Sequence, residues 1–374
     1  MQPLTYWRKV HENPKVFVRA PAGKQEASEI PTLGTKNNLL IINDMDKFYD
    51  ILILTFIAAT ALPAVILLYH QRRTPESWEQ KNKKLSSIIS YLLLLGTITV
   101  LYGSLIEPKL LITNYQTLDL EDIKNPIKIG LISDLHVGDF NKEIDIQKIA
   151  NRLLELNPDL VFIAGDHILT NYKEDDRLNY LKPLKEVAKK IPTYAVNGNH
   201  EYGVGSDDDD IQKRFRLPNR NREVAKAMRD LGIKYLINDV EKITVKDESF
   251  LLFGSDEYLI NAVDFENLKQ DKGDINMPVI MLSHNPAVIY LANEYNLKNE
   301  NDIDLVLSGH THGGQVRLPF IGVLQKIESD IPLSWYQGFN EFNGINLFVT
   351  SGANESGTRA RLFNPPEIVL LTIN

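Results

Sequence analysis

Residues 127–136 read IKIGLISDLH, an apolar run of strand length that ends in two polar side chains, Asp134 and His136. The same arrangement recurs four times further along the chain. The later stretches are Gly165-Asp166, Gly198-Asn199-His200-Glu201, His284 and Gly309-His310-Thr311-His312. The carboxyl ends of strands converge on one crevice in open α/β sheets, so these distant residues can meet there.

Apolar runs of strand length alternate with helical patterns over the part of the chain that follows residue 109. The runs cover residues 127–132, 160–164, 194–196, 279–282, 304–307 and 347–349. Between the first two, residues 144–156 place Ile146, Ile149, Leu153 and Leu156 on one helical face. This alternation predicts an α/β fold in which helices cover a mixed sheet.

Composition narrows the classes of function. The chain has 374 residues, which suits one α/β domain with an appendage, and its net charge of -8 argues against nucleic-acid binding. It contains no cysteine, so disulfide bonds and thiolate metal sites are excluded. Five of the eight histidines fall in the stretches above. Imidazole and carboxylate ligands in this number suit a pair of divalent metals, and paired metals suit phosphoester hydrolysis.

Two uncharged apolar runs precede this region, at residues 51–69 and 86–106. Nineteen helical residues, the length of the first run, rise roughly 28 Å, which is close to the thickness of a hydrocarbon core. Pro63 in the first run is tolerated in membrane helices. A buried hairpin of a soluble protein is the alternative, whereas a cleaved signal peptide would start nearer the N-terminus.

These runs divide the chain into three predicted parts: a flexible segment at 1–50, a two-helix membrane hairpin at 51–108 and a catalytic domain at 109–374. The loop between the runs carries five basic residues, Arg72, Arg73, Lys81, Lys83 and Lys84. Short loops rich in Lys and Arg stay in the cytoplasm. The sequence therefore predicts a multi-pass protein of the cell membrane with both termini and the catalytic domain outside the cytoplasm.

Each candidate site residue has an ordinary structural explanation when taken alone. An aspartate after a strand is commonly a helix cap or a turn residue, and Asn199 suits a left-handed turn beside Gly198. A lone histidine is commonly a surface residue or a hydrogen-bonded core residue. Turns alone do not explain why all these residues follow strands in one order.

The motifs Asp-x-His, Gly-Asp, Gly-Asn-His-Glu, His and Gly-His-Thr-His, in this order, resemble the signature of the calcineurin-like metallophosphoesterases. The resemblance runs from about residue 115 to the C-terminus. It implies an α/β four-layer sandwich of two mixed β-sheets flanked by helices, preceded here by two transmembrane helices. Residues 307–315 (LSGHTHGGQ) and 361–367 (RLFNPPE) resemble a bacterial membrane-associated branch. Some relatives there are phosphodiesterases, and some hydrolyse UDP-diacylglucosamine in lipid A assembly.

Carried over motif by motif, the resemblance implies two divalent metal ions that share one carboxylate. The ligands of the first would be Asp134, His136, Asp166 and His312, and those of the second would be Asp166, Asn199, His284 and His310. These ligand types fit Mn, Fe or Zn. The implied reaction is in-line attack on phosphorus by a metal-bridging hydroxide, without a covalent enzyme intermediate.

The resemblance also implies roles for two residues of the Gly-Asn-His-Glu motif. His200 would protonate the leaving oxygen, because the pKa of histidine lies near working pH, and the alternative is a role in orienting a ligand. Together with the bridging Asp166 it makes up the predicted catalytic pair. Glu201 stands where an aspartate is common, and an outer hydrogen bond is its expected role.

Other polar residues near the motifs have competing explanations. His167 could contact substrate, although strand alternation points it away from the metals. Asn285, Arg317 or Arg361 could bind phosphate oxygens, and a structural role is the alternative for the arginines. Residues 203–222 form a charged insertion that is predicted to cap the site, with the four aspartates at 207–210 in a solvated loop.

The sequence thus predicts a membrane-tethered phosphoesterase that hydrolyses a phosphodiester or pyrophosphate bond. A lipid-linked or envelope substrate is expected beside two membrane spans, and the bilayer itself is an expected partner. UDP-diacylglucosamine pyrophosphohydrolase-like activity is one form of this hypothesis, but the predicted outward topology disfavours it. Alternatives are a phosphomonoesterase or phosphoprotein phosphatase, and a non-catalytic membrane protein that binds phosphorylated ligands. The sequence does not predict the oligomeric state.

Overall fold

The computed structural model of the chain describes residues 35–374 except 121–122, 170–176, 206–210, 216, 271–276 and 300–302. The chain divides into two compact units, Met1–Asn43 and Asp44–Asn374, and apart from the start of one helix at residues 35–43 everything below concerns the second. The four aspartates at 207–210 and most of the predicted segment 1–50 lie outside the described residues.

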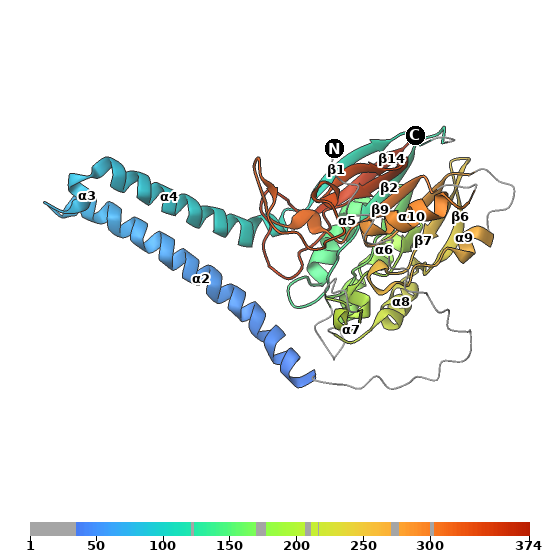
Figure 1. The fold of residues 1–374 in the computed structure, drawn as a ribbon, viewed down its shortest axis with the longest axis horizontal. Helices are drawn as coiled ribbons and strands as arrows, with labels where there is room; N and C mark the ends of the chain where they lie inside the picture. The colour runs from blue at the N-terminus through green and yellow to red at the C-terminus, as the bar shows by residue number, and fades with distance from the viewer. Residues whose placement is uncertain are drawn as a thin grey trace, which may run out of the picture. The chain divides into compact units, whose positions relative to one another are not determined.

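Two six-stranded mixed sheets form the centre of the region that follows residue 109 (Figure 1). The first sheet has the order β1-β14-β2-β3-β4-β5, and the second has the order β12-β13-β9-β8-β7-β6. The strands of the first are β1 Ile112–Leu118, β14 Glu367–Ile373, β2 Ile127–Ile132, β3 Leu160–Ile163, β4 Thr193–Ala195 and β5 Lys234–Tyr235. Those of the second are β12 Gly338–Phe342, β13 Ile345–Val349, β9 Leu305–Ser308, β8 Val279–Leu282, β7 Glu248–Gly254 and β6 Asp239–Val245.

Strand direction brings the predicted site residues to one edge of the sheets. In the first sheet β2, β3 and β4 are parallel neighbours, and in the second β7, β8, β9 and β13 are parallel. Antiparallel strands occur at β14 beside β2 and at the edges formed by β6 and β12. The polar stretches follow β2, β3, β4, β8 and β9, so in each sheet they leave at the same side.

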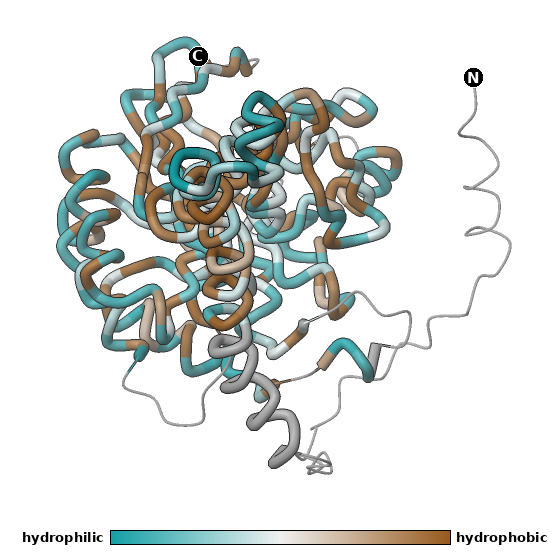
Figure 2. Tube along the Cα trace, turned by 90° about the vertical axis from the view of Figure 1, so that its left-hand side faces the viewer, coloured by the Kyte–Doolittle hydropathy of each residue, from teal (hydrophilic) through white to brown (hydrophobic). Residues whose placement is uncertain are grey.

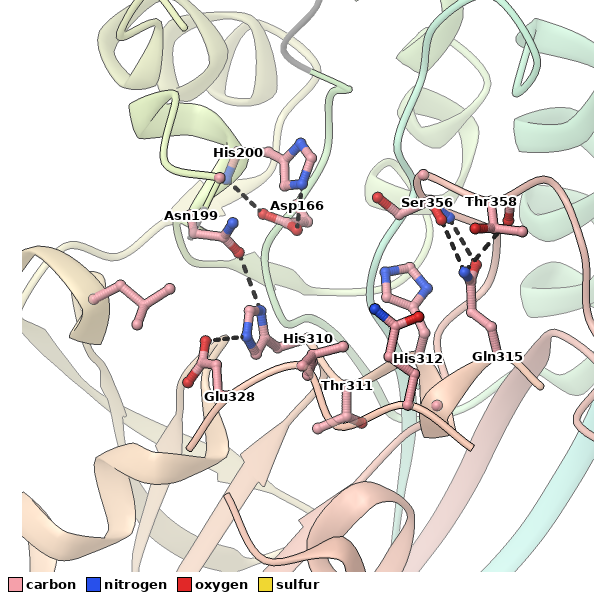
Figure 3. Close-up of a pocket in the computed structure, with 16 residues that line it drawn as sticks. Asp166, Asn199, His200, His310, Thr311, His312, Gln315, Glu328, Ser356 and Thr358 are labelled. Carbon is pink, nitrogen blue, oxygen red and sulfur yellow. Dashed lines mark hydrogen bonds and ion pairs between the residues drawn. The ribbon is translucent and has the colours of Figure 1, made fainter. Parts of the chain in front are cut away.

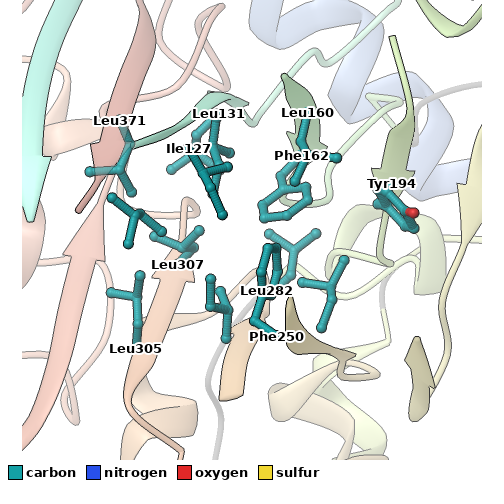
Figure 4. Packing of buried hydrophobic residues seen from close by; sticks show 14 of the residues in the cluster. Ile127, Leu131, Leu160, Phe162, Tyr194, Phe250, Leu282, Leu305, Leu307 and Leu371 are labelled. Carbon is teal, nitrogen blue, oxygen red and sulfur yellow. The ribbon is translucent and has the colours of Figure 1, made fainter. Parts of the chain in front are cut away.

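The two sheets pack face to face around an apolar core (Figure 4). Ile129, Leu131 and Phe162 of the first sheet belong to the same buried cluster as Leu282 and Leu307 of the second. Near-continuous apolar strands are required here because each sheet buries both faces.

Helices cover the outer face of each sheet. Ile146, Ile149 and Leu153 of α5 (Glu143–Leu156) pack with α6 (Leu184–Ala188) and α8 (Asn221–Asp230) on the first sheet. On the second, α9 (Glu266–Gln270) and α10 (Ile289–Asn296) pack against a third cluster. The predicted four-layer α/β sandwich is therefore confirmed.

Short elements complete the region that follows residue 109. The short helices are η3 Arg177–Leu181, η4 His200–Tyr202, α7 Ile211–Arg214, η5 Tyr258–Ile260, η6 Pro286–Val288, η7 His312–Gly314 and η8 Leu333–Tyr336. A small hairpin pairs β10 Arg317–Leu318 with β11 Gly322–Val323. Two of the short helices carry candidate site residues, His200 in η4 and His312 in η7.

Two long helices precede the sandwich, α2 (Thr35–Arg73) and α4 (Lys83–Leu101), which α3 (Trp78–Lys81) connects. The stretches Tyr49–Arg73 and Lys83–Lys109 are long and apolar enough to cross a membrane, and brown marks their apolar residues in Figure 2. Only 6% and 17% of their most apolar windows are buried, which disfavours the buried hairpin of a soluble protein. The two helices touch where Thr60 Oγ1 lies 2.8 Å from Thr97 Oγ1.

The end of the second helix is joined to the C-terminal loop of the sandwich. Helix α4 continues as η1 (Tyr102–Ile106) and η2 (Glu107–Lys109). The Arg361 amide donates to the Gly103 carbonyl at 2.9 Å, and the buried Glu107 carboxylate accepts from the amides of Phe363 and Asn364. A buried carboxylate that accepts two amide hydrogens fixes the helix end to the domain.

Candidate active site

The structure brings all eight predicted site residues together at the edge where the parallel strands end. Loops after β2, β3 and β4 of the first sheet carry five of them, and loops after β8 and β9 of the second carry three. The residues are Asp134, His136, Asp166, Asn199 and His200 on the first sheet, and His284, His310 and His312 on the second. The site therefore straddles the two sheets.

One group of donor atoms comes from Asp134, His136 and His312. The Nε2 atoms of the two histidines lie 3.1 Å apart, and their rings stack with centroids 5.0 Å apart. Asp134 Oδ1 lies 3.3 Å from Nε2 of His312 and 3.7 Å from Nε2 of His136. All three side chains are buried, so their donor atoms face one another and not solvent.

A second group comes from Asp166, Asn199, His284 and His310. His284 Nε2 lies 3.1 Å from each of three atoms: Asp166 Oδ2, Asn199 Oδ1 and Nδ1 of His310. Asp166 Oδ2 also lies 3.5 Å from Nε2 of His136 in the first group. Asp166 is therefore placed between the two groups.

These spacings are those of ligands around a cation. Two donor atoms that each lie about 2.1 Å from one ion are about 3.0–3.4 Å apart in common coordination geometries. Asp134 Oδ1 is buried and has no hydrogen-bond partner among the described residues. The Nε2 atoms of His136 and His312 face each other at 3.1 Å beside this unpaired oxygen of Asp134. A divalent cation fits here, because it would interact with the lone pairs of all three atoms at once.

The backbone around the site is strained at the candidate ligands themselves. Asp134, His136, Asp166, His310 and His312 have φ values of 59°, 41°, 52°, 70° and 50°. Non-glycine residues rarely adopt this left-handed region, and such conformations cluster at functional sites. Each sharp turn redirects the chain at a strand end so that the side chain points into the crevice.

Outer hydrogen bonds orient three of the histidines. His284 Nδ1 lies 2.7 Å from the Ala164 carbonyl, and His312 Nδ1 lies 3.1 Å from the Asn354 carbonyl. If these nitrogens donate to the carbonyls, Nε2 of each ring keeps its lone pair for the site. On His310 the pattern is reversed, because Nδ1 faces the site and Nε2 contacts Glu328 Oε1 at 2.6 Å.

Sequence reasoning missed Glu328 and Asn354. Glu328 is buried, accepts two hydrogen bonds from Asn285 at 3.1 and 3.0 Å, and faces His310. Burial raises the pKa of the Glu328 carboxyl, but His310 opposes it and the balance lies below the usual value. Neither residue follows an apolar strand directly, so no pattern in the sequence marked them.

Glu201 joins two of the site loops. Its carboxylate accepts from the amides of Gly198 at 2.6 Å, His167 at 2.8 Å and Asp166 at 3.1 Å. These bonds tie the loop after β3 to the loop after β4, which agrees with the expected outer hydrogen bond. Gly198 is required between them, because an added Cβ would overlap the Asp166 carboxylate.

His200 lies at the edge of a cavity of about 300 Å³ that opens onto the site (Figure 3). Its ring stands edge-on to that of His136 with centroids 4.6 Å apart, and its amide donates to Asp166 Oδ1 at 2.9 Å. Its side chain is 20% exposed, which makes it more accessible than the side chain of Asp166. Burial lowers the pKa of His200 to about 4, so the neutral ring is favoured before an anion binds.

The remaining polar candidates lie elsewhere. His167 is buried, with its ring 5.5 Å from that of Tyr235, and does not line the cavity. Asn285 is fully buried and bonded to Glu328. Arg361 is also fully buried and donates to the carbonyls of Ser351, Asn354 and Asn364, while Arg317 donates to the Gly313 carbonyl. The structure thus gives both arginines structural contacts and places neither on the cavity wall.

The predicted cap at 203–222 contributes Gly205 to the cavity wall. Leu259 lines the wall beside it, and Arg214 of the insertion bonds to the Leu259 carbonyl. Part of the insertion, 206–210 and 216, lies outside the described residues. Its role in capping the site stays a prediction.

Comparison with known proteins agrees with this geometry. The calcineurin-like phosphoesterase family profile matches residues 127–314. An uncharacterized metallophosphoesterase of Campylobacter jejuni is 31% identical over 78% of this chain and 71% of its own length. A phosphodiesterase of Escherichia coli, YaeI, is 28% identical over 68% of this chain and 84% of its own length. A transmembrane protein with a metallophosphoesterase domain from Danio rerio is 28% identical over 56% of this chain and 45% of its own length. With a family match that spans half of its length, the chain belongs to the calcineurin-like metallophosphoesterases.

Proposed function

We propose that the protein is a membrane-tethered phosphodiesterase that uses two divalent metal ions. The observation that carries this proposal is the pair of donor groups joined by Asp166, in which neighbouring donor atoms lie 3.1–3.7 Å apart. The similarity to a phosphodiesterase supports diester hydrolysis in particular.

Seven residues would hold the ions. Asp134, His136 and His312 would hold one ion, Asn199, His284 and His310 would hold the other, and Asp166 would contribute to both sites. When bound, such ions supply a hydroxide nucleophile near neutral pH and stabilise negative charge on the phosphate oxygens. The ligand types suit Mn, Fe or Zn.

His200 serves as the proton donor to the leaving oxygen. Its ring lines the cavity and is exposed enough to reach a bound substrate. The neutral ring favoured by burial must gain a proton before it can donate one, and an anionic phosphate beside it favours the imidazolium. Asp166 and His200 are thus the two residues to which we assign catalytic roles.

The substrate that we propose is a phosphodiester of the membrane or envelope. Two apolar helices lead directly into the sandwich, and Gly103 and Glu107 tie their end to the loop 361–364. This attachment would hold the site near the bilayer surface. The basic loop between the helices would face the cytoplasm and the catalytic domain the outside, which protease accessibility in intact cells would test.

The direct test is metal content and hydrolysis by the full chain in detergent. We expect about two metal ions per chain and hydrolysis of bis-p-nitrophenyl phosphate that a chelator removes and Mn²⁺ restores. Asp166→Asn should lower the occupancy of both sites and abolish hydrolysis.

Two other outcomes would favour the competing functions. Faster hydrolysis of p-nitrophenyl phosphate than of the diester would indicate a phosphomonoesterase. A folded chain that binds less than one ion and stays inert with Mn²⁺, Fe²⁺ and Zn²⁺ would indicate a phospho-ligand-binding protein without catalysis.

A further inference from the structure

A second cavity, of about 550 Å³, lies where α2 and α4 meet the catalytic region. Its apolar surface is built by Ile53, Leu54 and Ile57 of α2 together with Leu101 of α4 and Leu105 of η1. Leu54 and Leu105 are each 65% exposed. Exposure of such an apolar surface to water is unfavourable, whereas its contact with hydrocarbon chains is favourable.

The cavity is also lined by charged side chains of both signs. Two are basic, Arg359 and Lys109, and two are acidic, Asp50 and Glu355. Arg359 pairs with Asp50. Lys109 Nζ lies 3.9 Å from Glu355 Oε1 and 3.6 Å from Oδ1 of Asp145, which does not line the cavity. The cavity therefore combines an apolar surface on the helices with two basic and two acidic side chains.

Aromatic rings hold Arg359 in this place. Its guanidinium carbon lies 4.0 Å from the centre of the Phe140 ring and 5.4 Å from that of Tyr49. The Tyr49 hydroxyl donates to the Arg359 carbonyl at 3.2 Å. Stacking of this kind orients a guanidinium and leaves its edge for bidentate contacts with carboxylate or phosphate.

One loop forms part of both cavities. Glu355 and Arg359 line the cavity beside the helices, whereas Ser356, Gly357 and Thr358 between them line the cavity of the metal-ligand residues. Ser356 and Thr358 also bond through their carbonyls to Gln315. A molecule bound beside the helices therefore contacts the same loop that borders the candidate active site.

We propose that this cavity binds one phospholipid with a zwitterionic phosphoethanolamine head. Its acyl chains lie against Leu54, Ile57 and Leu105, which continue the apolar surface of the two helices into the cavity. Its phosphate contacts Arg359 and Lys109, and its ammonium contacts Asp50 and Glu355. The equal number of basic and acidic groups that line the cavity matches a head with both charges, because a purely anionic head would compete with Asp50 and Glu355 for Arg359 and Lys109 without offering these carboxylates a cation.

This inference rests on the proposed insertion of α2 and α4 into a membrane, which extraction of membranes with alkaline carbonate tests separately. Binding is measured on the full chain in detergent by native mass spectrometry, with dioleoyl phosphatidylethanolamine as the probe. Leu54→Trp fills the cavity from α2, and Leu62→Trp is its matched control. Leu62 is 60% exposed on the same helix and does not line the cavity.

Leu54→Trp should weaken lipid binding at least about tenfold, because the indole displaces acyl methylenes from the wall, and Leu62→Trp should bind like the unaltered chain. Arg359→Gln should weaken binding as well, with Arg152→Gln as a control away from the cavity. Leu54→Trp and the unaltered chain should hydrolyse bis-p-nitrophenyl phosphate at the same rate. Lipid binding and hydrolysis are measured separately, so a failure of the catalytic proposal can be distinguished from a failure of the lipid-binding proposal.

Equal lipid binding by the Leu54→Trp and Leu62→Trp chains, or none by the unaltered chain, would overturn the proposal. Phosphatidylglycerol binding as tightly as phosphatidylethanolamine would overturn the assignment of a zwitterionic head, because the anionic lipid lacks the ammonium that Asp50 and Glu355 are proposed to contact.

Discussion

Glu328 Oε1 lies 2.6 Å from Nε2 of His310, on the side of the ring opposite the candidate metal site. The carboxylate is itself held by Asn285, so the ring orientation is fixed from outside. A carboxylate behind a metal-binding histidine sets the tautomer and raises the basicity of the ligand nitrogen. Glu328 is therefore a positioning residue for His310.

Glu328→Gln should weaken metal binding at the His310 site about 10- to 100-fold, the usual effect of losing such an outer partner. Competition with a fluorescent chelator measures the affinity directly. Glu341→Gln is the control, because Glu341 is exposed on β12 and remote from the site. Unchanged affinity in Glu328→Gln would mean that Asn199 and His284 determine binding without this support.

His200→Ala should separate catalysis from metal binding. The His200 side chain is 20% exposed, against 3% for Asp166 and 10% for His312, which line the same cavity. Metal content should stay near two per chain, and diester turnover should fall by about two to four powers of ten, as expected for losing a general acid. Loss of metal in His200→Ala would instead make His200 a ligand, a role compatible with its place beside His136 and Asp166.

The sequence predicted the site through the strands that precede it. Near-continuous apolar runs form the strands β2, β3, β4, β8 and β9. The polar residues that follow these strands lie at the same edge of the sheets, where ligands bind in α/β folds. The helix expected at 144–156 is observed as Glu143–Leu156. The local sequence was sufficient to predict these strands and this helix. A strand that is buried on both faces is a continuous apolar run, and a helix that is buried on one face has apolar residues at helical spacing.

Other parts of the fold and site left no local signal. β1 alternates between exposed and half-buried residues, and its partner β14 lies some 250 residues later, so their pairing could not be read from either segment. Glu328 enters the site from an irregular loop, and its role depends on meeting His310 and Asn285 in space. Arg361 was a candidate phosphate ligand by residue type, but its three carbonyl partners come from folded loops.

Gly198→Ala should disrupt the site through sterics alone. An added Cβ would overlap the Asp166 carboxylate and approach its backbone nitrogen, and both belong to the loop that Glu201 clamps. Overpacking of this kind costs about 1–3 kcal/mol, so the melting temperature should fall by roughly 2–10 °C. Metal binding should weaken in the same variant because Asp166 is displaced.

Gly96→Ala is the matched control for this substitution. Nothing lies within 4 Å of the position that its Cβ would occupy, so neither melting temperature nor metal content should fall. If Gly198→Ala kept full metal content and melted with the unaltered chain, the loops after β3 and β4 would be more adaptable than their hydrogen bonds indicate.

Glu257 should make the stability of the metal-free protein depend on pH. Its side chain is buried, Oε1 accepts from the Leu259 amide at 3.0 Å, and Oε2 has no hydrogen-bond partner among the described residues. Burial raises the pKa of this carboxyl from 4.5 to about 7. The folded state therefore binds more protons than the unfolded state between these values, and stability falls as pH rises through this window.

Glu257→Gln removes this titration and should melt at a higher temperature than the unaltered chain at pH 8, with the difference shrinking toward pH 5. The shift corresponds to roughly 3 kcal/mol once the carboxyl is fully ionised in both states. Chelator must be present, because bound cations nearby would lower the pKa of Glu257 and mask the effect. The control Glu341→Gln should have the same melting temperature as the unaltered chain at every pH. Parallel curves for Glu257→Gln and the unaltered chain would mean that the buried carboxyl is already ionised in the folded protein, with the positive charge of His284 and His310 outweighing its burial.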